Sequence, residues 1–503
     1  MKTQSTPVAL LFLLASTSAI AGLPSEDGKL STAPTDNEAA EQLARIDELD
    51  DAGPLINAVI TVNRQAPFEA SDLRNMGPLR GRTVLVKDNI ETSEWPTTAG
   101  SLALQNNMTG RDATLIGYLR KAGGVVLGKT NLSEWANIRS DNSTSGWSAI
   151  GGLTRNPHAT DRNSCGSSSG SGAAVAAGFA WAAIGSETDG SITCPASING
   201  IVGFKPTIGV VSRTHVVPIS VSQDTAGPMA HSVYDAALLL GAIAGTDDAD
   251  PVTIDSRRTT DFTLDLDSYS LMGVRIGVMR KQIGNRADVS ALFNAALNDL
   301  KRAGAVLVDI EFEPQGEMYR DEFEVLLFEL RDGMDSYLQS LPGENLPRSL
   351  ADLVAFNKAN ADTEMRWFGQ ETFELALTKT DREAYLAARA NSLRLAGPEG
   401  IDKLLADNQV EFLIAPTAGP AWTTDLVNGD HFSGGIGMGS LAAISGYPHL
   451  TVPMGAVERL PVGISFIGGE WRDHAVLKAG AAYERARTAQ LPVPSFKPWS
   501  PQD

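Results

Sequence analysis

One lysine and two serines, in three separate segments, are of the types needed to activate a hydroxyl nucleophile without a histidine. Lys87 lies in Val-Lys-Asp-Asn, Ser167 lies in a loop rich in serine and glycine, and Ser191 closes the turn Thr-Asp-Gly-Ser. A neutral lysine can take a proton from one hydroxyl through another, which makes the first hydroxyl nucleophilic. These residues indicate a serine hydrolase that cleaves amides, provided that the fold brings them together.

The loop at 166–172, which we name the Ser/Gly loop, also fits other interpretations. A flexible linker would not lead directly into a strongly apolar segment, and a phosphate-binding loop needs a lysine that is missing here. The loop also matches the GxSxG nucleophile elbow, with Ser168 as nucleophile and His431 or His474, each preceded by an aspartate, as partner. That elbow needs a strand before it, and we expect none at 155–163, which is polar and interrupted by proline.

Helix-like and strand-like segments alternate along the chain, which is typical of an α/β fold. Hydrophobic periodicity and β-branched runs predict strands at 83–86, 125–127, 305–310, 412–415, 450–453 and 462–466. They predict helices at 37–50, 112–122, 172–184, 287–303 and 473–489. The continuously helical region 321–394 is expected to form a cover over the core. No linker interrupts the chain after 83, which favours one large domain at 37–503.

The chain has 503 residues and a net charge of −19, which argues against nucleic acid or an anionic membrane as partner. Lys2, an apolar run at 8–15 and the small residues at 19–21 are typical of a signal peptide over 1–21. We therefore expect export to the periplasm or the cell exterior, followed by a loose segment at 22–36; a buried N-terminal helix is the alternative. No later run reaches the roughly 18 apolar residues that a membrane helix needs.

The only two cysteines, Cys165 and Cys194, lie within three residues of Ser167 and Ser191. They could form a disulfide, or they could pack as small buried thiols, which is the interpretation that we favour. The sequence has no CxxC motif and no Cys/His cluster, so it offers no support for a zinc site.

Taken together, these segments resemble the amidase signature family from about residue 37 onward. The resemblance rests on Val-Lys-Asp-Asn at 86–89, the Ser/Gly loop and Thr-Asp-Gly-Ser-Ile at 188–192. Further family-like segments lie at 128–131, 202–207, 224–229 and 460–463. Segments 131–137, 145–148, 165–171 and 188–192 are most similar to members that remove the C-terminal amide of peptides. Asp189, where the family usually has glycine, and Thr193, where it usually has arginine, depart from the pattern.

The resemblance implies one large domain with a central mixed β-sheet flanked by helices on both faces. It implies that Ser191 attacks the amide carbonyl and that Ser167, after a cis peptide bond, relays the proton between Ser191 and Lys87. The oxyanion hole would be formed by the backbone N–H groups of Thr188, Asp189, Gly190 and Ser191. No metal or organic cofactor is expected, and the protein is expected to be a monomer that binds a small-molecule or peptide amide. Acyl, aryl or amino-acid amides or esters remain alternative substrates, and a catalytically silent binding protein is an alternative of another class.

Two expectations concern the neighbours of these residues. Lys87 must be neutral to accept a proton, which requires desolvation or a nearby positive charge. Asp88 would oppose this if it faced Lys87, but successive side chains of a strand point to opposite sides. Asp189 is a candidate contact for a backbone N–H of the peptide.

Overall fold

The computed structural model describes residues 34, 37–254, 257, 259, 261–432 and 435–501. The signal peptide predicted at 1–21 and almost all of the segment at 22–36 lie outside these residues. In the described ranges, no helix is long and apolar enough to cross a membrane.

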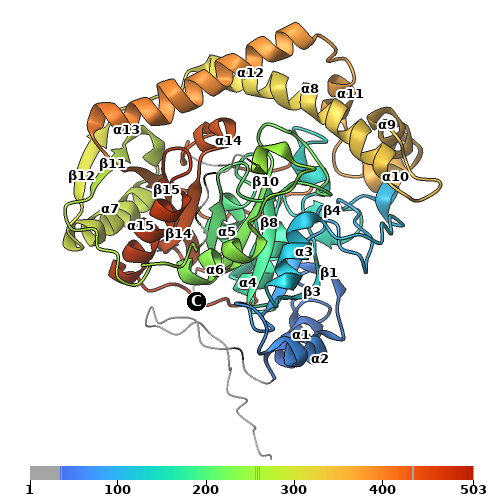
Figure 1. Cartoon of the computed structure of the whole chain (residues 1–503), viewed down its shortest axis with the longest axis horizontal. Coiled ribbons are helices and arrows are strands. Elements are labelled where there is room, and N and C mark those ends of the chain that lie inside the picture. Colours follow the sequence, from blue (N-terminus) through green and yellow to red (C-terminus); the bar gives the residue numbers. More distant parts are fainter. Residues whose placement is uncertain are drawn as a thin grey trace, which may run out of the picture.

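A central mixed sheet organises the described part of the chain (Figure 1). Its eleven strands there follow the spatial order β1-β3-β2-β8-β10-β9-β14-β15-β13-β11-β12. The strands are β1 (Val59–Val62), β2 (Thr83–Lys87), β3 (Val125–Thr130), β8 (Ala182–Glu187), β9 (Val202–Lys205), β10 (Thr225–Ala230), β11 (Arg275–Met279), β12 (Val306–Ile310), β13 (Phe412–Pro416), β14 (His449–Val457) and β15 (Leu460–Ile467). The pairs β2–β3, β2–β8, β11–β12 and β11–β13 are parallel, and the other pairs are antiparallel.

Helices cover both faces of the sheet, as predicted. One face packs on α3 (Thr114–Lys121), α6 (Val233–Ile243), α7 (Ala287–Arg302) and α15 (Asp473–Ala486). The other packs on α1 (Glu38–Leu49), α4 (Ser169–Ala176) and α5 (Thr193–Ile198), with α14 (Leu441–Ser445) farther along the sheet. In β2, Val84 and Val86 face the first layer and Leu85 faces the second. The same alternation turns Lys87 toward the α4 layer, where the Ser/Gly loop lies.

The region predicted as continuously helical contains α8 (Gly316–Ser340), α9 (Leu350–Ala359), α10 (Ala361–Glu364), α11 (Glu371–Ala376) and α12 (Arg382–Ala396). Figure 1 shows α8 and α12 running side by side across one end of the molecule. The rings of Phe328 and Tyr385 stack between them, with their centroids 4.3 Å apart. Further helical elements are α2 (Ala66–Leu73) and α13 (Lys403–Asn408).

The predicted helix at 172–184 is wrong in its second half. Helix α4 ends at Ala176, and residues 182–187 form β8, which lies between β2 and β10. Gly178 has a φ of 73°, a left-handed conformation that glycine adopts without strain and that commonly follows a helix end. An apolar run of alanine and glycine fits a buried helix and a central strand equally well, so periodicity could not separate them.

The expectation of no strand at 155–163 is also wrong. Two short strands, β6 (Arg155–Asn156) and β7 (Ala159–Asn163), pair with each other in a separate two-stranded sheet. They do not belong to the central sheet, so the Ser/Gly loop does not follow a strand of that sheet as an α/β-hydrolase elbow does.

Candidate active site

Lys87 ends β2 in a fully buried position and points at the Ser/Gly loop. Its Nζ donates to Ser167 Oγ at 2.7 Å, to Ser186 Oγ at 2.9 Å and to the Ser186 carbonyl oxygen at 3.1 Å. Asn89 Nδ2 also donates to Ser186 Oγ, at 2.9 Å. A lysine and a serine 80 residues apart are thus joined directly, with Ser186 of the neighbouring strand β8 as a second contact.

The surroundings of Lys87 favour its neutral form. Burial lowers the pKa of Lys87 to about 7, against the opposing effects of the Asp224 and Glu187 charges. Asp88 does not face it, because Asp88 pairs with Lys129 at 2.9 Å on the other side of the strand. Lys87 therefore titrates near neutral pH, which suits a group that must accept and return a proton.

The Ser/Gly loop holds Ser167 in a fixed, fully buried position. The peptide bond between Gly166 and Ser167 is cis, and the backbone N–H of Ser133 donates to the Ser167 carbonyl oxygen at 3.0 Å. A Cβ at Gly166 would lie 2.2 Å from Ser133 Oγ, so only glycine fits there. The loop thus packs closely against the segment that follows β3, which leaves Ser167 facing Lys87.

Ser191 lies at the end of the 188–191 turn, which connects β8 to α5. Thr188 Oγ1 donates to Asp224 Oδ1 at 2.6 Å, and Glu187 accepts the backbone N–H groups of Ile192 at 2.7 Å and Thr193 at 3.0 Å. A buried carboxylate at the end of the strand therefore fixes the start of α5. The turn itself is solvent-accessible: Asp189 is exposed and Ser191 is 8 % exposed.

The two serine segments also contact each other. The backbone N–H of Ser168 donates to the carbonyl oxygen of Ser191 at 3.1 Å. In the described part of the chain, the direct side-chain contact within the predicted trio is that of Lys87 with Ser167, and Ser191 is linked to the Ser/Gly loop through its backbone contact with Ser168. A buried lysine–serine pair beside a serine that ends a turn of backbone N–H groups can activate a nucleophile and stabilise an oxyanion.

Comparison with known proteins assigns this arrangement to a family. A family model described as Amidase matches residues 41–477. The chain belongs to the amidase family. It is therefore a hydrolase that acts on amide C–N bonds, and the predicted resemblance to amidase signature enzymes is confirmed.

Relatives of this amidase include a solved structure and curated sequences. The native peptide amidase of Stenotrophomonas maltophilia is 47% identical, with a TM-score of 0.86 over 92% of this chain and 95% of that chain. A probable amidase of Arabidopsis thaliana is 34% identical over 475 residues, which cover 90% of this chain and 87% of the relative. A component of the glutamyl-tRNA(Gln) amidotransferase of Deinococcus radiodurans is 32% identical over 463 residues, or 87% of this chain and 92% of that protein.

Ser168, the alternative nucleophile of this amidase, is fully buried, and its hydroxyl is hydrogen-bonded to the backbone of Ser186. Its Oγ donates to the Ser186 carbonyl oxygen at 3.1 Å and accepts the backbone N–H of Ser186 at 3.2 Å. The histidines lie elsewhere: His431 approaches Asp425 at 3.6 Å, and His474 contacts the carbonyl oxygen of Leu264 at 2.7 Å. The structure does not bring Ser168 and either histidine together.

The favoured interpretation of the cysteines as thiols is wrong. Cys165 and Cys194 form a disulfide with an S–S distance of 2.01 Å. The bond joins a residue just before Ser167 to one just after Ser191, so it links the two serine segments covalently. Trp422 packs against this disulfide in a small apolar cluster. Free thiols are often buried, but the general preference does not reveal that the fold brings these two side chains together.

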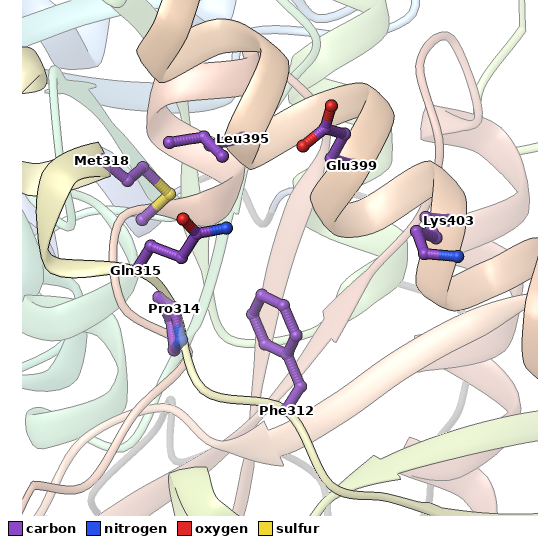
Figure 2. A pocket seen from close by; sticks show the side chains of 7 residues that line it. All are labelled: Phe312, Pro314, Gln315, Met318, Leu395, Glu399 and Lys403. Carbon is purple, nitrogen blue, oxygen red and sulfur yellow. The ribbon is translucent and has the colours of Figure 1, made fainter.

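A pocket of about 410 Å³ lies apart from these residues (Figure 2). Figure 2 shows the ring of Phe312 and the side chains of Met318 and Leu395 in its lining, together with Glu399 and Lys403. None of the predicted catalytic or oxyanion-hole residues lines it. The pocket is therefore separate from the predicted catalytic residues.

Two groups that contact the site, Ser186 and Glu187, were not predicted from the sequence as functional residues. Both end the unpredicted strand β8, and both contact parts of the predicted trio or its turn. The only signal in the sequence is that these two residues directly precede Thr-Asp-Gly-Ser. That position indicates a role at the site only if the preceding segment is known to be a strand.

Proposed function

We propose that this amidase hydrolyses the C-terminal amide of peptides to the free acid and ammonia. The 2.7 Å contact between Lys87 Nζ and Ser167 Oγ, in a fully buried site, is the observation that carries the mechanism. The substrate class is supported by the 47% identity to the peptide amidase of Stenotrophomonas maltophilia.

The proposed reaction moves one proton along the serine–serine–lysine path. Ser191 Oγ attacks the amide carbonyl carbon while its proton passes to Ser167 Oγ, and the Ser167 proton passes to Lys87 Nζ. The carbonyl oxygen becomes an oxyanion facing the backbone N–H groups of Thr188, Asp189, Gly190 and Ser191. Removing one such donor typically costs on the order of a hundredfold to a thousandfold in rate.

Collapse of the tetrahedral intermediate breaks the C–N bond. The leaving nitrogen takes a proton from Ser167, which is replenished from Lys87, and departs as ammonia. A water molecule then attacks the Ser191 ester and gives its proton through Ser167 to Lys87. As the peptide acid leaves, the Ser191 oxygen takes a proton back from Ser167, which is replenished from Lys87. The complete cycle returns the three side chains to their starting state.

Ammonia release tests the substrate class directly. We expect kcat/KM for N-acetylated dipeptide amides to exceed that for fatty amides and simple aryl amides. A preference for fatty or aryl amides would overturn the peptide assignment and leave the amide hydrolase in place. Labelling of Ser191 by a serine-directed covalent probe, lost in Ser191→Ala, distinguishes the enzyme from a silent binding protein.

We also propose that residues 1–21 direct export, that 37–503 fold as one domain covered by the helices of 321–394, and that the protein is monomeric. Mass spectrometry of the protein from the periplasm or medium is expected to find an N-terminus just after residue 21. Light scattering is expected to give the mass of one chain. An intact N-terminus on a cell-retained protein contradicts the first proposal, and a dimer mass contradicts the last.

A further inference from the structure

The carboxyl group of Glu322, on α8 of the helical region, lies near that of Asp189 in the 188–191 turn. Asp189, in the turn, accepts a hydrogen bond from Ser440 Oγ at 2.5 Å, just before α14. Glu322, on α8, is only 6 % exposed, and Gln223 Nε2 donates to its Oε1 at 3.0 Å. The same amide nitrogen of Gln223 donates to the Thr188 carbonyl oxygen at 3.4 Å. Three distant segments therefore converge on the turn that carries Ser191.

The carboxyl groups of Asp189 and Glu322 differ in how readily each becomes negatively charged. Burial and the nearby Asp189 charge raise the pKa of Glu322 well above its usual range. Protein around the Asp189 carboxylate removes it partly from water and raises the pKa of Asp189 to about 6, while the Ser440 hydrogen bond opposes this rise. These shifts favour the proton on Glu322 and the negative charge on Asp189.

The two carboxyl groups also differ in their exposure to solvent. Asp189 is exposed, whereas Glu322 and Gln223 are buried behind it. The charged member of the pair is therefore the one that a substrate can reach, two residues from the proposed nucleophile. A carboxylate in this position accepts hydrogen bonds and repels other anions.

From this geometry we propose that Asp189 is a specificity-determining residue that binds an N–H group on the acyl side of the scissile amide. This inference rests on the proposed function. In a peptide amide, the Cα atom next to the scissile carbonyl carries a peptide N–H. In a free amino-acid amide, the same Cα atom carries an ammonium. Fatty amides and simple aryl amides present neither group. Ser440 and Glu322 are positioning residues that hold the Asp189 carboxylate toward this group.

Three substrates that share the 3-phenylpropanamide skeleton separate the possible ligands of Asp189. N-acetylphenylalanine amide offers a neutral N–H, phenylalanine amide offers an ammonium, and 3-phenylpropanamide offers neither. A hydrogen bond to a charged group contributes enough that its loss lowers kcat/KM by roughly tenfold to a hundredfold. In Asp189→Asn we therefore expect the ratio of kcat/KM for a nitrogen-bearing substrate to that for 3-phenylpropanamide to fall by at least about tenfold.

The substrate that shows the fall identifies the ligand. A fall with N-acetylphenylalanine amide assigns the peptide N–H, and a fall with phenylalanine amide assigns the ammonium. Ratios that stay within about twofold of the wild type for both substrates would overturn the proposal. Glu324→Gln, two residues from Glu322 on α8 and paired with Lys379, is the matched control and is expected to leave both ratios unchanged.

A second variant keeps the proposal testable if Asp189→Asn does not fold. Ser440→Ala removes a hydrogen bond that favours the Asp189 anion, so it raises the pKa of Asp189. The acidic fall in the same ratio is then expected at higher pH than in the wild type. The titratable groups facing Asp189 are Glu187 from β8, Lys205 from β9, and Tyr319 and Glu322 from α8. An unmoved profile contradicts the proposal.

Failure of this inference is distinguishable from failure of the proposed function. The titration of Lys87 affects all three substrates alike and cancels in the ratios. If Asp189 plays no part in specificity, the wild type still releases ammonia from all three, and Ser191→Ala still abolishes it. If the proposed substrate class is wrong, the wild type prefers fatty or aryl amides, and if the proposed nucleophile is wrong, Ser191→Ala retains activity. Neither result depends on the ratios measured in Asp189→Asn.

Discussion

The Ser/Gly loop and the 188–191 turn each present a serine to the same site, but they present it in opposite ways. Ser167 is fully buried and fixed by Lys87, whereas Ser191 is partly accessible at the end of a turn whose neighbour Asp189 is exposed. A group that only transfers protons can be sealed from water, which keeps the lysine beside it neutral. A group that attacks substrate must be reached from outside. The difference between the segments thus matches the difference between the proposed roles.

Removing the Ser191 hydroxyl is the strongest test of this contrast. Ser191→Ala is expected to lower kcat by at least about 10⁴-fold, because loss of a nucleophile removes the covalent path. Steady-state ammonia release measures the loss. Ser169→Ala is the matched control, since its buried hydroxyl has no partner in the described part of the chain. If Ser168→Ala were as inactive as Ser191→Ala, the nucleophile-elbow interpretation would return.

Removing the base is expected to have the next largest effect. Lys87→Met keeps a long side chain but no proton acceptor, and general-base loss typically costs about 10²–10⁴-fold in kcat. Single-turnover kinetics should show slow acylation. Circular dichroism checks that the fold is retained, and wild-type acylation in a folded Lys87→Met enzyme would refute the relay.

The disulfide affects stability more than chemistry. The Cys165–Cys194 bond closes a loop with a sequence separation of 29, and constraining such a loop in the unfolded chain contributes about 3–4 kcal/mol. The double variant Cys165→Ser/Cys194→Ser is therefore expected to unfold at lower denaturant concentration. Equilibrium unfolding followed by tryptophan fluorescence measures the shift. An unchanged midpoint would mean that other contacts alone hold the serine segments together.

The pH dependence of the reaction tests, without a mutation, whether the buried Lys87 beside Ser167 acts in its neutral form. Because burial lowers the pKa of Lys87 to about 7, the neutral, active fraction grows as the pH rises through that value. About a tenth of the lysine is neutral one unit below its pKa, so kcat/KM for 3-phenylpropanamide should be about tenfold lower at pH 6 than on its alkaline plateau. A profile that is flat from pH 6 to 8 would contradict a neutral lysine as base.

The smallest effect is expected at the strand end that shapes the turn. Glu187→Gln replaces a carboxylate, whose Oε2 accepts both backbone N–H groups, with a neutral amide oxygen. Because hydrogen bonds to a charged group are stronger than those to a neutral one, kcat should fall by about fivefold. Thr193→Val removes only a 3.4 Å side-chain contact to the same carboxylate and should cost less. Equal losses in the two variants would argue that Glu187 does not position the turn.

Local patterns predicted β2, β3 and the first half of α4 near the site, but not β8, β9, β10 or α5. The strand ending at Lys87 is β2, and the helix expected at 37–50 is α1. These predictions succeeded because β-branched runs and amphipathic periods record which face of an element is buried. The run at 172–184 failed because small apolar residues fill a helix and a central strand equally well. Strand β8, which was not predicted, contains Ser186 and Glu187 and leads directly into the 188–191 turn.

The sequence by itself determined the family and the chemical class and predicted the residues of the trio, because these depend on residue types in fixed local segments. Only the tertiary structure decided that Ser168 is occupied by Ser186, that the cysteines are bonded, and that Glu322 meets Asp189. Each of these facts is a contact between segments far apart in the chain. Such contacts depend on how the layers pack, which sets the burial and pKa of each group, and no local pattern records it.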